Sequence, residues 1–122
     1  MSKKSVVVID DCAFHLQLVR EILEPAGYEV ITAESPIAAN THIFKTPPPS
    51  LLLVDVEMPM INGVEKVRLL KKREASRSIP ALLMSTKSTQ EMAALAADSG
   101  ADGFLCKPFK KDDLLREVDR YI

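Results

Sequence analysis

The chain has 122 residues, 47% hydrophobic and 27% charged, which is typical of a soluble globular domain with one core. Its net charge of −1 gives no sign of a basic patch, so we expect no direct nucleic-acid binding. No apolar run approaches the roughly 20 residues that span a bilayer, and Asp10–Asp11 interrupt the N-terminal run too early for a signal peptide. We therefore expect a cytoplasmic protein without membrane contact, whose cysteines are reduced.

Five short apolar runs along the chain predict five β-strands. They consist mostly of Val, Ile and Leu without polar alternation, which is typical of strands covered on both faces. The runs are residues 6–9, 30–33, 51–54, 81–84 and 104–106.

Between these runs the spacing of apolar residues predicts helices. Phe14, Leu18 and Ile22 recur at i, i+4 and i+8, and we expect them to form the buried face of a helix that ends near Glu24. The pair Ser35–Pro36 joins an N-cap residue to proline at the first helical position, and predicts a second helix that begins there and reaches about Phe44.

Three further helices are predicted in the second half of the chain. One of them begins near Ser88 or Thr89 and ends at Gly100, which is a favoured residue at a helix C-terminus. Their apolar faces are, in chain order, Val64, Val67 and Leu70 or Lys71; Met92 and Leu95; and Leu114, Val118 and Tyr121.

Five alternating strand–helix units predict an α/β fold with a parallel sheet and helices on both faces. We choose a flavodoxin-like, doubly wound (βα)5 arrangement with strand order 2-1-3-4-5, as a single domain over residues 1–122. The periodicity alone does not separate this order from that of a dinucleotide-binding fold.

Polar residues stand at the end of four of the predicted strands. These residues are Asp10–Asp11, Asp55, Ser85–Thr86 and Lys107. Ligands of such sheets bind beyond the carboxyl ends of the strands, so we expect these side chains to meet at one edge. Any one of them has an ordinary alternative, such as a helix cap for Asp11 or a surface lysine for Lys107, but their common position favours a site.

Clustered carboxylates need a compensating cation. Two unit charges about 4 Å apart repel by roughly 4 kcal/mol at an effective dielectric constant near 20. Oxygen ligands select a hard ion, so we expect Mg2+, with Mn2+ as an alternative, and Lys107 as a further positive charge. A carboxylate beside a divalent ion and a lysine is placed to attack phosphorus and form an acyl phosphate.

The polar residues belong to an ordered set of motifs. The motifs are Val8-Ile9-Asp10-Asp11; Leu53-Val54-Asp55-Val56-Glu57-Met58-Pro59, followed by Asn62-Gly63; Ile79-Pro80, then Met84-Ser85-Thr86; and Gly100-Ala101-Asp102-Gly103-Phe104-Leu105-Cys106-Lys107-Pro108-Phe109. With this set the chain resembles, over essentially its whole length, the receiver domain of bacterial two-component response regulators.

The resemblance implies that Asp55 accepts a phosphoryl group from a histidine kinase or a phosphotransfer protein. It implies that Asp10, Asp11 and Asp55 bind Mg2+, with the backbone carbonyl of Glu57 as a further ligand. Such a domain is a phosphorylation-dependent signalling switch, not an enzyme, although it assists its own Mg2+-dependent phosphorylation and dephosphorylation. The output partner or fused effector is not identified by the motifs.

The resemblance also assigns residues that respond to the phosphoryl group. Lys107 and the Ser85–Thr86 pair would contact it, and the peptide bond between Lys107 and Pro108 is expected to be cis. Ser85 and Phe104 would be the switch positions that change the surface of the fourth helix, fifth strand and fifth helix. Phe104 replaces the tyrosine of many members, so it can repack but cannot donate a hydrogen bond.

Residues around the mouth of the site receive smaller roles. Glu57 and Lys87 would pair there, restrict attacking water and tune dephosphorylation. His15 and His42 lack metal-ligand spacing and are interpreted as solvated helix residues. Cys12 and Cys106 would lie roughly 14 Å apart across the sheet, too far for a disulfide.

Other functions fit the residues less well. A phosphatase of the haloacid dehalogenase type needs Asp-x-Asp after the first strand, and a flavodoxin needs a loop rich in Ser, Thr and Gly there. The chain has the adjacent pair Asp10–Asp11 instead. The remaining alternative is a receiver-like interaction module that is never phosphorylated, although such modules usually lose the acceptor, an acid or the lysine.

Overall fold

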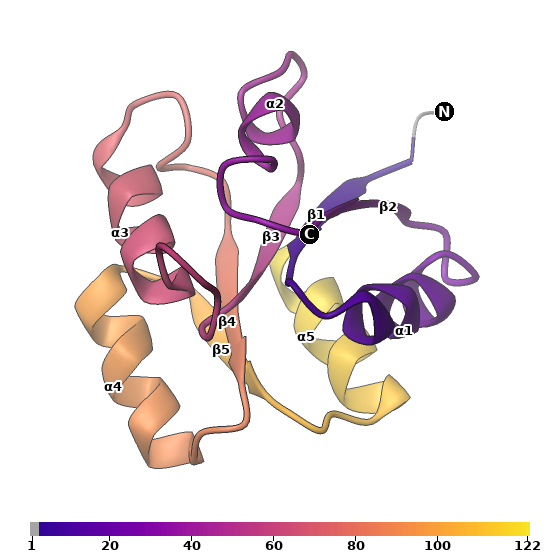
Figure 1. The fold of residues 1–122 in the computed structure, drawn as a ribbon. Helices are drawn as coiled ribbons and strands as arrows, with labels where there is room; N and C mark the ends of the chain where they lie inside the picture. Colours follow the sequence, from indigo (N-terminus) through magenta and orange to yellow (C-terminus); the bar gives the residue numbers. More distant parts are fainter. Residues whose placement is uncertain (1–2) are drawn as a thin grey trace.

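The computed structural model describes residues 3–122, and five parallel strands form its sheet in the order β2-β1-β3-β4-β5 (Figure 1). The strands are β1 (Ser5–Ile9), β2 (Glu29–Ala33), β3 (Leu51–Asp55), β4 (Ala81–Ser85) and β5 (Gly103–Cys106). The predicted fold class and strand order are confirmed. All five predicted strands form, each longer by one residue than predicted.

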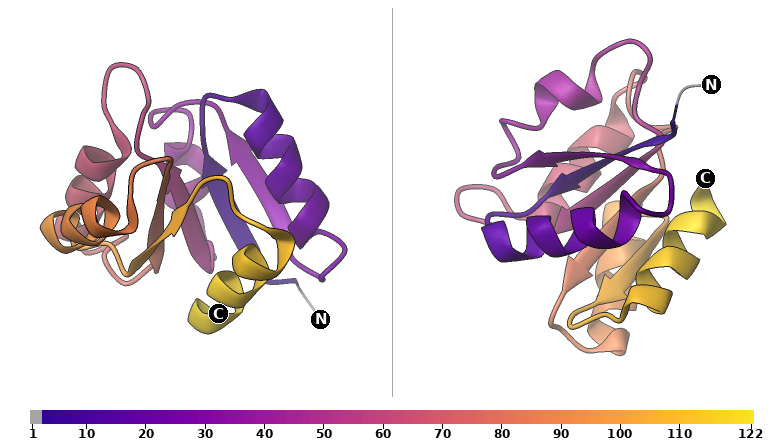
Figure 2. Two further views of the ribbon diagram at one scale, coloured as in Figure 1. Left: turned by 90° about the horizontal axis from the view of Figure 1, so that it is seen from below. Right: turned by 90° about the vertical axis from the view of Figure 1, so that its right-hand side faces the viewer.

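Helices cover both faces of this sheet. They are α1 (Ala13–Leu23), α2 (Asn40–Ile43), α3 (Gly63–Lys72), α4 (Thr89–Ser99) and α5 (Lys111–Tyr121). Helices α1 and α5 lie on one face, and α2, α3 and α4 lie on the other, as the two views of Figure 2 show. Within residues 3–122, no helix is long and apolar enough to cross a membrane.

The central strands are buried because both faces carry helices. Alternate residues of β1 point to opposite layers: Val6 and Val8 pack with α1 and α5, whereas Val7 and Ile9 pack with α2, α3 and α4. All residues of β3 and β4 are buried. This two-sided burial explains why the strand sequences are continuous apolar runs. The packed sheet is also a rigid base, here called the floor of the site, and the polar residues at the strand ends project from it.

Helix α4 begins and ends where its sequence predicts. The Ser88 hydroxyl accepts a hydrogen bond from the Glu91 backbone N–H (3.2 Å), and the Glu91 carboxylate accepts one from the Ser88 N–H (3.3 Å). Gly100 ends the helix with φ of 81°, a left-handed conformation that glycine adopts without steric cost. These local signals fix where α4 begins and where it ends.

The predicted face of α1 is partly wrong. Leu16, Val19 and Leu23 are buried together with Ile22, while Phe14 is 70% exposed. The helix carries two overlapping apolar stripes, and tertiary packing against the sheet and α5 decides which one is buried. Phe14 is therefore a surface residue at the beginning of α1.

The predicted beginning of α2 is also wrong. The Ser35 hydroxyl does accept a hydrogen bond from the Ala38 N–H (3.0 Å), but residues 36–39 form turns and the helix contains only Asn40–Ile43. A cap and a proline favour helical conformation locally, but they do not ensure continuous i to i−4 bonding. Here Asn40 donates its N–H to the carbonyl of Ile37 instead (3.1 Å).

Candidate functional site

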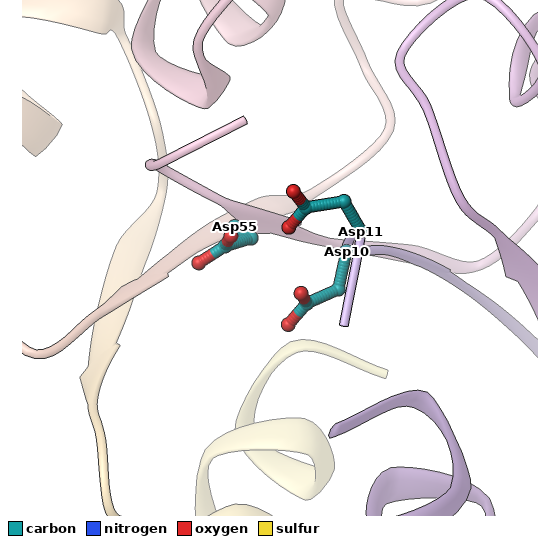
Figure 3. Close-up of side chains that lie close together, drawn as sticks. All are labelled: Asp10, Asp11 and Asp55. Atoms are coloured by element: carbon teal, nitrogen blue, oxygen red, sulfur yellow. The ribbon is translucent and has the colours of Figure 1, made fainter. Parts of the chain in front are cut away.

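Three carboxylates meet at the carboxyl edge of the sheet. Asp10 and Asp11 directly follow β1, and Asp55 is the last residue of the neighbouring β3. One oxygen from each lies within 4.8 Å of the others. Figure 3 shows the side chains of Asp10 and Asp11 extending toward Asp55. Asp10 and Asp55 are almost completely buried, at 1% and 5% exposed, whereas Asp11 is open to solvent.

Lys107 lies between two of these carboxylates. Its Nζ donates hydrogen bonds to Asp10 Oδ2 at 2.7 Å and to Asp55 Oδ1 at 3.1 Å, and it lies 3.0 Å from His15 Nδ1. The Lys107 side chain is only 7% exposed. An ammonium has three N–H donors, so these three neighbours account for all of them.

The charges in this cluster shift one another's ionisation. Burial raises the pKa of Asp55 to about 6, and the attraction of Lys107 opposes that rise only in part. Burial works to lower the pKa of Lys107, but the hydrogen bond and charge of Asp10, together with Asp55, raise it above its usual value. Because its hydrogen bond to Asp10 is the shorter one, the ammonium compensates the negative charge of Asp10 more fully than that of Asp55.

The loop after Asp55 is held against the end of β3. The Gly63 N–H donates to the carbonyl of Val56 (2.9 Å), and Asn62 caps α3 by accepting from the Glu65 N–H (2.9 Å). A Cβ on Gly63 would lie 2.1 Å from the Asp55 carbonyl oxygen, so the beginning of α3 can approach this closely only with glycine. This contact fixes the backbone that carries Asp55.

Glu57, Ser85 and Lys87 form a hydrogen-bonded group at the mouth of the site. The buried Ser85 hydroxyl donates to Glu57 Oε1 (2.5 Å) and accepts from the backbone N–H of Lys87 (3.2 Å). The ammonium of Lys87 lies 3.9 Å from the same Glu57 oxygen. Both charged side chains are exposed, so this ion pair contributes little to stability.

The site is an open hollow of about 230 Å³. Its lining residues are Asp10, Asp11, Cys12, His15, Asp55, Glu57, Thr86 and Lys107. The predicted switch residue Phe104 lies outside this lining and packs, partly buried, against the core beneath α3 and α4. The peptide bond between Lys107 and Pro108 is cis, as expected, and Cys12 and Cys106 are both free thiols.

His15 is the site residue that the sequence analysis missed. The sequence predicts a solvated helix residue here, but the His15 imidazole contacts Lys107 and lies 3.3 Å from Asp10 Oδ2. Its position in the first turn of α1, shortly after Asp10–Asp11, was the available signal. The partner Lys107 is 92 positions away, so sequence spacing did not reveal the contact.

The cluster fits a divalent, hard cation. Three carboxylates and one ammonium leave two formal negative charges, which the two positive charges of one such ion would balance. All three converging side chains offer oxygen, the donor that Mg2+ and Mn2+ prefer. Of the three carboxylates only that of Asp11 is exposed, so an ion has access to the cluster from the Asp11 side.

Comparison with known proteins identifies similar chains. The model of the response regulator receiver domain family matches residues 6–119. Protein PilG of Pseudomonas aeruginosa is 32% identical over 117 residues, covering 96% of this chain and 86% of that protein. Chemotaxis protein CheY of Bacillus subtilis is 28% identical over 115 residues, 94% of each chain.

A longer relative and a solved structure extend this comparison. The phosphate regulon transcriptional regulatory protein PhoB of Pseudomonas aeruginosa is 31% identical over 97% of this chain, which spans only 51% of that protein. The structure of chemotaxis protein CheY4 of Vibrio cholerae superposes with a TM-score of 0.90 at 30% identity, covering 99% of this chain and 100% of that one.

The raised pKa of Asp55 predicts a pH-dependent effect of Asp55→Asn on the metal-free protein. Asp55 ionises near pH 4 when unfolded and near pH 6 when folded, so the stability it contributes is complete below about pH 4 and lost as pH rises through 6. Asparagine does not ionise, so the variant does not lose this stability as the pH rises. We expect Asp55→Asn to raise the free energy of unfolding by about 1–3 kcal/mol at pH 7 and by almost nothing at pH 4.

Denaturant unfolding in a chelator at both pH values measures this difference. Asp112→Asn, which removes an exposed carboxylate on α5, is the matched control and should change stability little at either pH. A lower stability of Asp55→Asn than of the wild type at pH 7 would contradict the prediction.

Proposed function

The chain belongs to the response regulator receiver domain family, and from this premise we propose that Asp55 takes a phosphoryl group and makes residues 1–122 a signalling switch. Receiver domains are signalling domains of two-component systems, which interact with histidine kinases or phosphotransfer proteins and with effectors. The observation that carries the proposal is the buried Lys107 ammonium held between Asp10 and Asp55. We place this activity in the cytoplasm.

The residues supply the parts that phosphoryl transfer needs. A carboxylate oxygen of Asp55 attacks the phosphorus, the bond from phosphorus to the donor's nitrogen or oxygen breaks, and an aspartyl phosphate forms. Charge then spreads over the phosphoryl oxygens, where the adjacent Lys107 ammonium stabilises it. The partial compensation of Asp55 leaves it available as the attacking group, and its pKa of about 6 still leaves it mostly ionised at neutral pH.

Receiver domains bind Mg2+ in an acidic pocket, and we assign that role here to Asp10, Asp11 and Asp55, with the backbone carbonyl of Glu57. A bound Mg2+ would neutralise phosphoryl oxygens and carboxylates together. A receiver domain of a sensor histidine kinase from Pseudomonas aeruginosa, which shares the fold at a TM-score of 0.86, has a magnesium ion in its active-site cleft. Mn2+ offers the same charge and oxygen preference.

The surroundings of the hollow favour a protein as phosphodonor. Phe14 is 70% exposed and Met60 is 97% exposed, and each lies in the segment that follows a strand end bearing an aspartate. Exposed apolar side chains around a polar site are typical of a surface that another protein covers. We therefore propose a histidine kinase or a phosphotransfer protein as donor, and an output protein or fused effector as recipient of the signal.

Phosphorylation is tested with acetyl phosphate and Mg2+. Intact-mass analysis should show the addition of one phosphoryl group to the wild type and none to Asp55→Asn, because the variant lacks the attacking oxygen. Equal labelling of both chains would contradict the assignment. A wild type that takes up no phosphoryl group would instead favour a receiver-like interaction module.

Metal binding is tested by thermal unfolding. Mg2+ should raise the melting temperature of the wild type, because it binds the folded chain and relieves repulsion among three carboxylates. Asp11→Asn should remove most of this rise. It should also raise the melting temperature without metal, because one of three clustered negative charges is gone. The control is Asp112→Asn, which should respond to Mg2+ as the wild type does; an unchanged wild-type melting point across millimolar Mg2+ contradicts the metal site.

The switch itself is assigned to Ser85 and Phe104. Ser85 now donates to Glu57, and we propose that its hydroxyl turns to a phosphoryl oxygen while Phe104 repacks beneath α4. Glu57 and Lys87 then tune dephosphorylation by restricting water at the mouth, where Thr86 also lines the hollow. This is a shift in population between two packings of one fold.

Beryllofluoride, a phosphoryl mimic, tests this switch by amide chemical shifts. The wild type should show perturbations from Met92 through Leu115, and Ser85→Ala should reduce them although Asp55 still accepts phosphate. Perturbations confined to the loops around Asp55 would contradict the assigned output surface.

A further inference from the structure

The imidazole of His15 shares the Lys107 ammonium with the two buried carboxylates. His15 Nδ1 lies 3.0 Å from Lys107 Nζ, a distance as short as that from Nζ to Asp55 Oδ1 (3.1 Å). His15 is in the first turn of α1, where the next residue, Leu16, is packed in the core. The ring also meets Phe14 edge to face, with centroids 6.0 Å apart. The imidazole therefore has a defined position beside the ammonium.

Donor and acceptor chemistry determines the form of this contact. A lysine ammonium has donors only, so Nδ1 must present its lone pair to Lys107, and the ring proton resides on Nε2. The same nitrogen lies 3.3 Å from Asp10 Oδ2, which is also an acceptor, so the contact with Lys107 is the attractive one. In this contact His15 Nδ1 is the acceptor, beside two carboxylate acceptors.

His15 and Lys107 together form a partition between two hollows. On one side is the acidic hollow with Asp10 and Asp55, and on the other is a small apolar hollow lined by Phe14, Leu18 and Phe109. Both side chains border both hollows. His15 is thus a polar partner of Lys107 that also lines the apolar hollow, whereas Asp10 and Asp55 line only the acidic one.

We propose that His15 is a positioning residue for phosphoryl transfer, holding the Lys107 ammonium beside Asp55 when the carboxylates take other partners. The inference rests on the proposed function, in which Asp10 and Asp55 become metal ligands and Asp55 becomes phosphorylated. Both acceptors then share their oxygens with other groups, and a flexible four-carbon side chain would lose its fixed direction. His15 is not one of the converging carboxylates, so its hydrogen bond with Lys107 is kept when their oxygens bind other groups.

The test compares His15→Leu, which removes the acceptor, with His15→Asn, which keeps an acceptor oxygen near the place of Nδ1. His42→Leu is the matched control, because His42 lies on α2, on the opposite face of the sheet from α1. Two quantities are measured with acetyl phosphate: the rate of Asp55 phosphorylation at saturating Mg2+, and the Mg2+ concentration for half-maximal thermal stabilisation. Crystal structures with Mg2+ give the distance from Lys107 Nζ to Asp55 Oδ1.

We expect His15→Leu to lower the saturated rate about tenfold, as for the loss of one hydrogen bond to a charged group, without changing the half-maximal Mg2+ concentration. Lys107 Nζ should move away from Asp55 in that variant, and His15→Asn should restore both the rate and the distance. An unchanged rate in His15→Leu, a change confined to the Mg2+ concentration, or no rescue by His15→Asn overturns the positioning role while Asp55 phosphorylation stands. A wild type that is not phosphorylated overturns the proposed function as well.

Discussion

The structure depends on the buried ammonium of Lys107 and the two carboxylates that it joins. Asp10 and Asp55 are almost inaccessible to solvent, and each would be costly to bury as a lone charge. Lys107 compensates them unequally, with 2.7 Å to Asp10 and 3.1 Å to Asp55. The tighter pair fixes the lysine. Burial raises the pKa of Asp55 to about 6, and the looser pair with Lys107 offsets that rise only in part.

The strand order makes this arrangement possible. Asp10 and Asp55 end adjacent strands, β1 and β3, while Lys107 follows β5, which is two strands from β3, or about 10 Å at the usual strand spacing. Only a long side chain can bridge that span, and the Lys107 N–H is itself anchored to the Ser85 carbonyl at the end of β4 (2.7 Å). The apolar layers on both faces of the sheet hold the strand ends in place. The attraction among the polar groups is therefore not needed to bring these ends together.

The sequence predicted well what depends on local signals and on strand polarity. The five strands, the capping of α4 by Ser88 and Gly100, and the meeting of Asp10, Asp55 and Lys107 all follow from such signals. It predicted poorly what depends on tertiary choice. The exposed Phe14 belongs to one of two overlapping apolar stripes on α1, and only packing selects between them. His15 was missed for the same reason, because its partner becomes its neighbour only after β5 has been added to the sheet.

The buried strands and the exposed polar residues at the mouth of the site differ in how much free energy a rearrangement would cost. Side chains of β3 and β4 are packed on both faces, so moving them would open cavities. The Ser85 hydroxyl is different, because its acceptor is the carboxylate of Glu57, a side chain that is half exposed. Exchanging one charged acceptor for another preserves the hydrogen bond, so the two states differ little in free energy from this contact. In the proposed switch, phosphorylation of Asp55 then needs to supply only a small bias to change their populations, and the partly buried Phe104, on the strand next to β4, would repack with it.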